Sequence, residues 1–94
     1  MTPYEQIIEA IIGKQVLVLG QHIALLRARR VHGLLVEDDG GGVKLSGEPL
    51  HAIEQLIVEY REILGPAADL FSRDAALPII EAHPDLLVPL TLKQ

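Results

Sequence analysis

The stretch VHGLLVEDDGGGVKLSGEP, residues 31–49, divides the chain into two helical halves and decides how they are joined. Two short strand-like runs, residues 34–37 and 43–46, flank the sequence DDGGG, which is typical of a turn because glycine adopts positive φ without strain. The pattern predicts a β-hairpin over residues 34–46. Because an isolated two-stranded hairpin is marginal in water, it must lie on the helices or pair edge to edge with its copy in a second subunit.

Upstream of the hairpin, residues 4–31 have the spacing of one long helix, with apolar residues every three or four positions. A helix-capping signature stands at the start of this stretch and is made of a threonine, a proline and a glutamate (Thr2, Pro3 and Glu5). The run VLVL at residues 16–19 is also compatible with a buried strand, since it is half β-branched and a glycine follows it. We expect a helix over residues 4–31 and keep a strand at residues 16–19 as the alternative.

Downstream of the hairpin, residues 49–64 carry apolar side chains on one helical face and charged ones on the other, which predicts an amphipathic helix. A glycine and a proline then end that helix and permit a short one over residues 66–76, which should stop before Pro78. Residues 78–94 contain three prolines and many aliphatic residues. This tail is too apolar to be free in water, so we expect it to pack on the body, across a dimer or on a partner.

Together these elements predict a single domain, residues 1–94, of the α+β class and mainly α. Of the 94 residues 49% are hydrophobic but only 3% aromatic, so the core must be built from aliphatic side chains. A chain this short buries only about 60–65% of its unfolded surface, and association is a common way for small domains to gain stability. The mean hydropathy of +0.29 points the same way. We therefore expect an intertwined or helix-packed homodimer built on the first helix.

Composition also limits the setting and the partners. The chain has no cysteine, which excludes a disulfide-stapled secreted domain, and residues 1–5 lack the basic start of a signal peptide. Charged and polar residues interrupt the apolar region 7–26, so we expect no membrane partner. The net charge of −5 disfavours nucleic acid as a partner, although a local basic patch could still bind it. We expect a cytoplasmic protein.

The sequence carries no motif for catalysis, for a cofactor or for a metal ion. Its four histidines show neither H-x3-H nor H-E-x-x-H spacing. Ser46 and Ser72 lack the context of a nucleophile elbow, and the glutamates of residues 49–64 lie on the polar helix face. We therefore expect a protein that is not an enzyme and has no cofactor.

The remaining function class is a protein-interaction or regulatory module that binds its own copy and a protein partner of unknown identity. Three features are candidate partner contacts: the basic end of the first helix, the acidic hairpin tip and the apolar tail. Their residues are Arg27, Arg29, Arg30, Asp38, Asp39, Leu86, Leu87 and Leu90. The arginines also have a simpler interpretation, because cations suit a helix C-terminus and can pair with nearby acids.

A basic helix end that is followed by a hairpin and a further helix resembles the winged-helix DNA-binding domains. The resemblance implies an alternative function, a DNA-binding transcriptional regulator that uses the basic end of the first helix and the hairpin. The acids at the hairpin tip, Asp38 and Asp39, oppose contact with phosphates. The motif V-x-G-L-L-V-x-D-x-G at residues 31–40 is also similar to the first half of roadblock-type dimerisation modules, and we infer no function from it.

Overall fold

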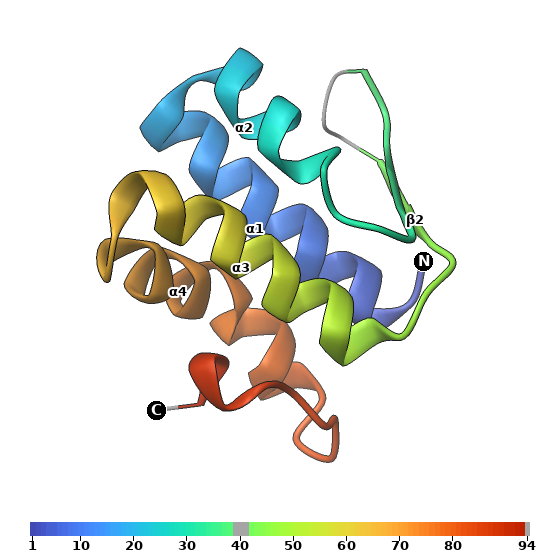
Figure 1. The fold of residues 1–94 in the computed structure, drawn as a ribbon. Helices are drawn as coiled ribbons and strands as arrows, with labels where there is room; N and C mark the ends of the chain where they lie inside the picture. The colour runs from blue at the N-terminus through green and yellow to red at the C-terminus, as the bar shows by residue number, and fades with distance from the viewer. Residues whose placement is uncertain (39–41, 94) are drawn as a thin grey trace.

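The first helix lies at the centre of the fold, and the other elements cover it (Figure 1). The computed structural model describes residues 1–38 and 42–93. The described elements are, in chain order, α1 (Pro3–Leu19), α2 (Gln21–Ala28), β1 (Leu34–Val36), β2 (Val43–Leu45), α3 (Pro49–Leu64), α4 (Ala67–Ala82) and the 3-10 turn η1 (Leu90–Leu92). Four helices and one antiparallel hairpin confirm the predicted α+β class, mainly α.

Helix α1 begins with the capping signature that the sequence predicts. The Thr2 hydroxyl accepts a hydrogen bond from the backbone N–H of Glu5 (3.1 Å), and the Thr2 N–H donates to the Glu5 carboxylate (3.0 Å). The helix continues without interruption to Leu19. Residues 16–19 are therefore helical, and the strand alternative for them is wrong.

The expected single helix over residues 4–31 is wrong, because the chain breaks at Gly20 into α1 and α2. Gly20 has φ 86° and ψ 156°, a region of backbone space that is essentially open only to glycine. Its N–H closes α1 on the carbonyl of Val16, and its own carbonyl accepts the N–H of Ala24 at the start of α2. After this break α2 packs against α1 and α3, so both sides of the glycine cover one core (Figure 1).

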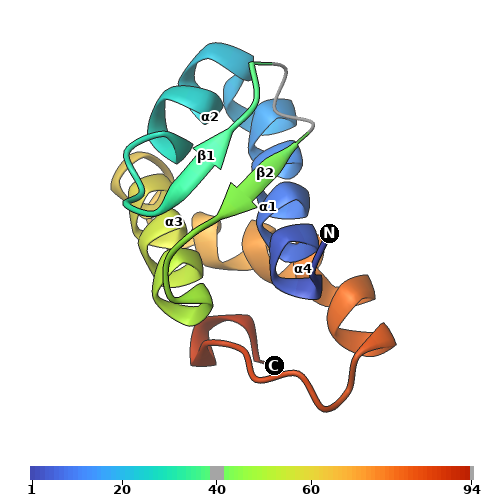
Figure 2. The ribbon, with the colours of Figure 1, turned by 90° about the vertical axis from the view of Figure 1, so that its right-hand side faces the viewer.

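The hairpin packs on the helices of its own chain. β1 and β2 pair with Leu34 opposite Leu45 and Val36 opposite Val43, and Figure 2 shows the two strands lying over α1 and α2. One carboxylate oxygen of Glu5 accepts the backbone N–H of Leu45 (3.0 Å), so α1 occupies a donor on β2 that a further strand would need. Of the two expected locations for the hairpin, the structure shows the one within the chain.

Helix α3 has the bounds that its periodicity predicts, 49–64, and Glu48 caps it by accepting the N–H groups of Leu50 (3.2 Å) and His51 (2.7 Å).

The predicted end of the next helix before Pro78 is wrong, because α4 runs on to Ala82. A proline removes one helical hydrogen bond and frees the carbonyl four residues earlier. Here Pro78 and Asp74 are both exposed, so water can solvate that carbonyl and the helix continues.

The core is mostly aliphatic, as the composition predicts, and Tyr60 is a fully buried aromatic member of it. Helix α1 contributes a fully buried stripe to it, and α2, α3, α4 and the hairpin supply the surrounding side chains. The stripe consists of Ile7, Ile8, Ile11, Ile12 and Gln15. The apolar face of α1 is therefore buried against other elements of its own chain.

The tail after α4 turns back under α3 and α4 and ends in η1 (Figure 2). Leu92 is buried in the core, and Leu86 and Val88 pack partly against it.

Within residues 1–38 and 42–93, no helix combines the length and the apolarity that a membrane crossing requires.

Candidate functional site

Two of the three predicted arginines form a charged cluster between α2 and α3. Arg27 donates to the carboxylates of Glu59 (3.2 Å) and Glu62 (2.6 Å), and the Nε of Arg30 lies 3.2 Å from Glu59. We call these four residues the arginine–glutamate cluster. The cluster agrees with the simpler interpretation of the basic segment, in which the arginines pair with acids of their own chain.

The cluster joins the end of α2 to the second half of α3. Glu59 and Glu62 are three residues apart within α3 and so stand on one side of that helix, whereas Arg27 lies in the last turn of α2 and Arg30 in the turn that follows it. The side chains of Glu59 and Arg27 are only 15% and 23% exposed, whereas those of Glu62 and Arg30 are 54% and 58% exposed. The inner half of the cluster is therefore satisfied within the chain, and the outer half still faces the surface.

The third arginine belongs to a different contact. Arg29 donates to the carboxylate of Asp38 (3.4 Å) and to the carbonyl of Glu37 (3.3 Å), and Gln21 donates to the carbonyl of Asp38 (3.4 Å). These bonds tie α2 to the hairpin where β1 leaves the sheet. The other predicted tip residue, Asp39, lies outside the described residues.

The predicted tail contacts lie far from the arginines, at the opposite end of the molecule from α2 (Figure 1). Leu87 and Leu90 are 69% and 80% exposed, whereas Leu86 is half-buried against the core. The hydroxyl of Tyr4 donates to the carbonyl of Leu87 (2.8 Å) and fixes the tail to α1. The structure thus brings Arg29 and Asp38 together but leaves the tail as a separate surface.

Sequence reasoning missed a set of apolar side chains that face outward. Ile23 and Leu26 on α2 are 37% and 50% exposed, and Ile63 on α3 is 40% exposed. In the sequence, Ile23 and Leu26 continue the apolar stripe of one long helix. The break at Gly20 turns α2 so that Ala24 and its neighbours face inward instead. The sequence carries no signal for this orientation, because it follows from the break at Gly20.

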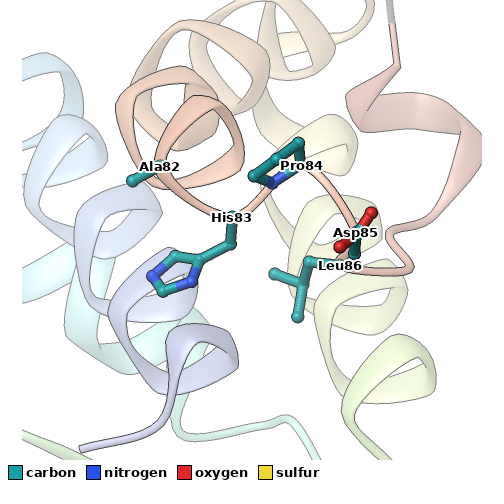
Figure 3. A pocket seen from close by; sticks show the side chains of 5 residues that line it. All are labelled: Ala82, His83, Pro84, Asp85 and Leu86. Atoms are coloured by element: carbon teal, nitrogen blue, oxygen red, sulfur yellow. The ribbon is translucent and has the colours of Figure 1, made fainter.

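Hollows on the described surface include one beside the tail and one beside the hairpin. One of about 400 Å³ is lined by Ala82, His83, Pro84, Asp85 and Leu86 at the turn after α4 (Figure 3). All five belong to one segment, the first four are exposed, and the imidazole and the carboxylate stand apart in Figure 3. This hollow therefore lacks the convergent, buried polar groups that an enzyme site needs.

The second hollow, of about 380 Å³, lies where α2 meets the hairpin. It is lined by Gln21, His22, Leu25, Arg29 and Asp38. Arg29 and Asp38 pair with each other there, and Gln21 bonds to the backbone, so three of its polar groups are already engaged. The hollow is better described as the seam between two packed elements than as a site for a ligand.

Two ionisable groups with shifted pKa values hold elements together. The backbone N–H groups of Thr2 and Leu45, both bonded to the Glu5 carboxylate, lower its pKa below the ordinary value. Burial, helped by the charge of Glu59, raises the pKa of Tyr60, whose hydroxyl donates to the Ala24 carbonyl (2.8 Å). Both groups therefore serve the packing of helices and hairpin.

The described residues hold no group of three histidine, aspartate or glutamate side chains that is placed to bind a metal ion. Comparisons of the chain with protein-family models, with curated proteins and with solved structures find no match. Surface features of the described residues include the arginine–glutamate cluster, the outward apolar side chains beside it and the exposed leucines of the tail.

Proposed function

We propose that the protein is a non-catalytic interaction or regulatory module that acts in the cytoplasm as a small homodimer and presents a helical surface to a protein partner. The observation that supports this most is the outer side of α2. Leu26 stands half exposed there, beside Ile23, on a helix whose inner side already contributes to the core. Apolar side chains gathered on an outer face are typical of a protein–protein contact.

The exposed surface area refines how such a dimer would form. The chain exposes 5297 Å², and a stable monomer of 10.3 kDa exposes about 5,350 Å². The domain therefore completes its core without a partner, and the buried stripe of α1 is covered by its own chain. This favours helix-packed association of two folded chains over an intertwined dimer that shares a core.

A winged-helix-like DNA-binding regulator is the competing proposal, and it uses the same arginines. In the structure Arg27 and Arg30 each contact Glu59, and Arg29 lies against Asp38. Paired carboxylates weaken the positive potential that attracts phosphates, and the net charge of the chain is −5. These contacts support the interaction module over the DNA-binding regulator.

Light scattering of the purified chain tests the proposed homodimer. We expect a mass of twice 10.3 kDa at micromolar to submillimolar concentration. A mass of one chain over that whole range would refute the homodimer.

A mobility shift on random duplex DNA at low salt tests the competing proposal. The interaction module predicts no shift at tens of micromolar protein. A shift that weakens in the double variant Arg29→Ala, Arg30→Ala would establish the DNA-binding regulator in its place.

A further inference from the structure

We propose that two copies of this chain pair through the α2–α3 face, with α2 of one copy lying on α3 of its partner. This inference rests on the proposed homodimer and names its interface. The α2–α3 face consists of the arginine–glutamate cluster together with three exposed apolar residues, Ile23, Leu26 and Ile63.

The face has an apolar end and a charged end. Helices α2 and α3 are in contact and run in opposite directions, so the start of α2 lies beside the end of α3 (Figure 1). The hydrogen bond from Tyr60 to the Ala24 carbonyl fixes this alignment. Ile23 precedes Ala24 on α2, and Ile63 follows Tyr60 on α3, so the two isoleucines share one end. The cluster occupies the rest of the face together with Leu26, which directly precedes Arg27 on α2.

The charges on this face form two parallel rows of opposite sign. The arginines stand on the α2 side, and the glutamates stand on the α3 side. Under a twofold axis that lies in the interface plane, parallel to the two helices and midway between them, each residue keeps its level, which is its position along the helix direction. This axis places α2 of one copy on α3 of the other. It places the arginine row of each copy on the glutamate row of the other. An in-plane axis perpendicular to the helices would instead place like charges on each other.

The same axis also matches the apolar residues. Because the level along the helices is kept, Ile23 of one copy meets the apolar end of the other copy, where Ile63 stands. The most exposed members of the charged rows, Arg30 at 58% and Glu62 at 54%, can face the partner copy while each keeps its contact with Glu59 or Arg27 of its own chain. A second copy therefore complements the face in charge and in apolar contact at once, and this selects it as the occupant.

Sedimentation equilibrium of three full-length variants tests the interface. Leu26→Lys adds a cation beside the arginine row and removes an apolar contact, so we expect the dissociation constant of the dimer to rise about tenfold or more. Leu17→Lys is the matched control, because Leu17 is 84% exposed on α1 and is not part of the α2–α3 face. Leu90→Lys tests the exposed tail in the same way. Both should leave dimerisation unchanged.

The outcomes separate this inference from the function on which it rests. A dimer that Leu26→Lys weakens, while the other two variants do not, supports the α2–α3 face. A dimer that Leu26→Lys leaves intact, or that Leu90→Lys weakens instead, overturns the interface and leaves the homodimer standing. A monomer for the unchanged chain at every concentration overturns both. Circular dichroism of each variant confirms that its helices are retained.

Discussion

At the scale of single residues, Gln15 is the least expected feature of the core. Its side chain is fully buried in α1, and neither amide atom has a hydrogen-bond partner among the described residues. A buried polar group without a partner costs about 1–3 kcal/mol of stability. The sequence places Gln15 on the buried stripe, so its location was predictable, but its lack of a partner depends on which side chains surround it.

Replacing this amide with an apolar side chain should stabilise the fold. We expect Gln15→Leu to raise the free energy of unfolding by about 1 kcal/mol, because the desolvated amide is removed at similar volume. Ser72→Ala is the comparison, since Ser72 is equally buried but donates to the Ala68 carbonyl (2.7 Å), and this variant should gain nothing. Urea unfolding measures both. A loss of stability in Gln15→Leu would show that the amide is hydrogen-bonded in solution.

Glu5 should make the stability of the fold depend on pH. Because its pKa is lowered in the folded state, its carboxylate stabilises the protein above the ordinary value of 4.5, and this contribution is lost as pH falls through the folded-state pKa. We expect Glu5→Gln to be less stable than the unchanged chain at neutral pH, and the gap to close below about pH 4.5.

Urea unfolding of Glu5→Gln at neutral and acidic pH measures this gap. Glu54→Gln, at an exposed position on α3, is the control. The difference in stability between Glu54→Gln and the unchanged chain should change less with pH. A gap between Glu5→Gln and the unchanged chain that is the same at every pH would contradict the assigned role of the Glu5 carboxylate.

At the scale of elements, the sequence predicted structure best where one local signal acted alone. The helix over residues 49–64 has an unbroken apolar stripe and a capped start, and its bounds were correct. The prediction of one long first helix failed because a glycine within a periodic pattern permits both a continuous helix and a break, and the packing of α2 against α1 and α3 decides between them. Helix α4 runs past the predicted end at residue 76 because Pro78 faces water, which the local sequence does not reveal.

Two glycines of the first region should respond in opposite ways to the same substitution. Gly20→Ala places a side chain at φ 86°, which should lower the free energy of unfolding by about 1–3 kcal/mol. Gly13 lies inside α1, where an added Cβ meets nothing within 4 Å, so Gly13→Ala should raise it by about 0.5–1 kcal/mol. Thermal unfolding of the two variants is the measurement. Equal effects would contradict a break confined to Gly20.

At the scale of the whole molecule, the candidate contacts divide into features that the sequence could place and features that it could not. The pairing of Arg27 with acids was predictable in kind, because cations at a helix end seek carboxylates. The acids themselves, Glu59 and Glu62, come from a helix about 30 residues away, so their identity required the fold. The outward turn of Leu26 also required it, because the break at Gly20 reorients the whole of α2.

The most direct test of the α2–α3 interface is disulfide cross-linking. The chain has no cysteine of its own, so only the introduced cysteines can form a disulfide. The α2–α3 face predicts that Ile23→Cys chains mixed with Ile63→Cys chains form a linked species of twice the chain mass under mild oxidation, in higher yield than either variant alone. Leu17→Cys, at an exposed position of α1 that is not part of the α2–α3 face, should give little linked species. Equal yields from Leu17→Cys and from the mixture, or no linked species in the mixture, would contradict the proposed interface.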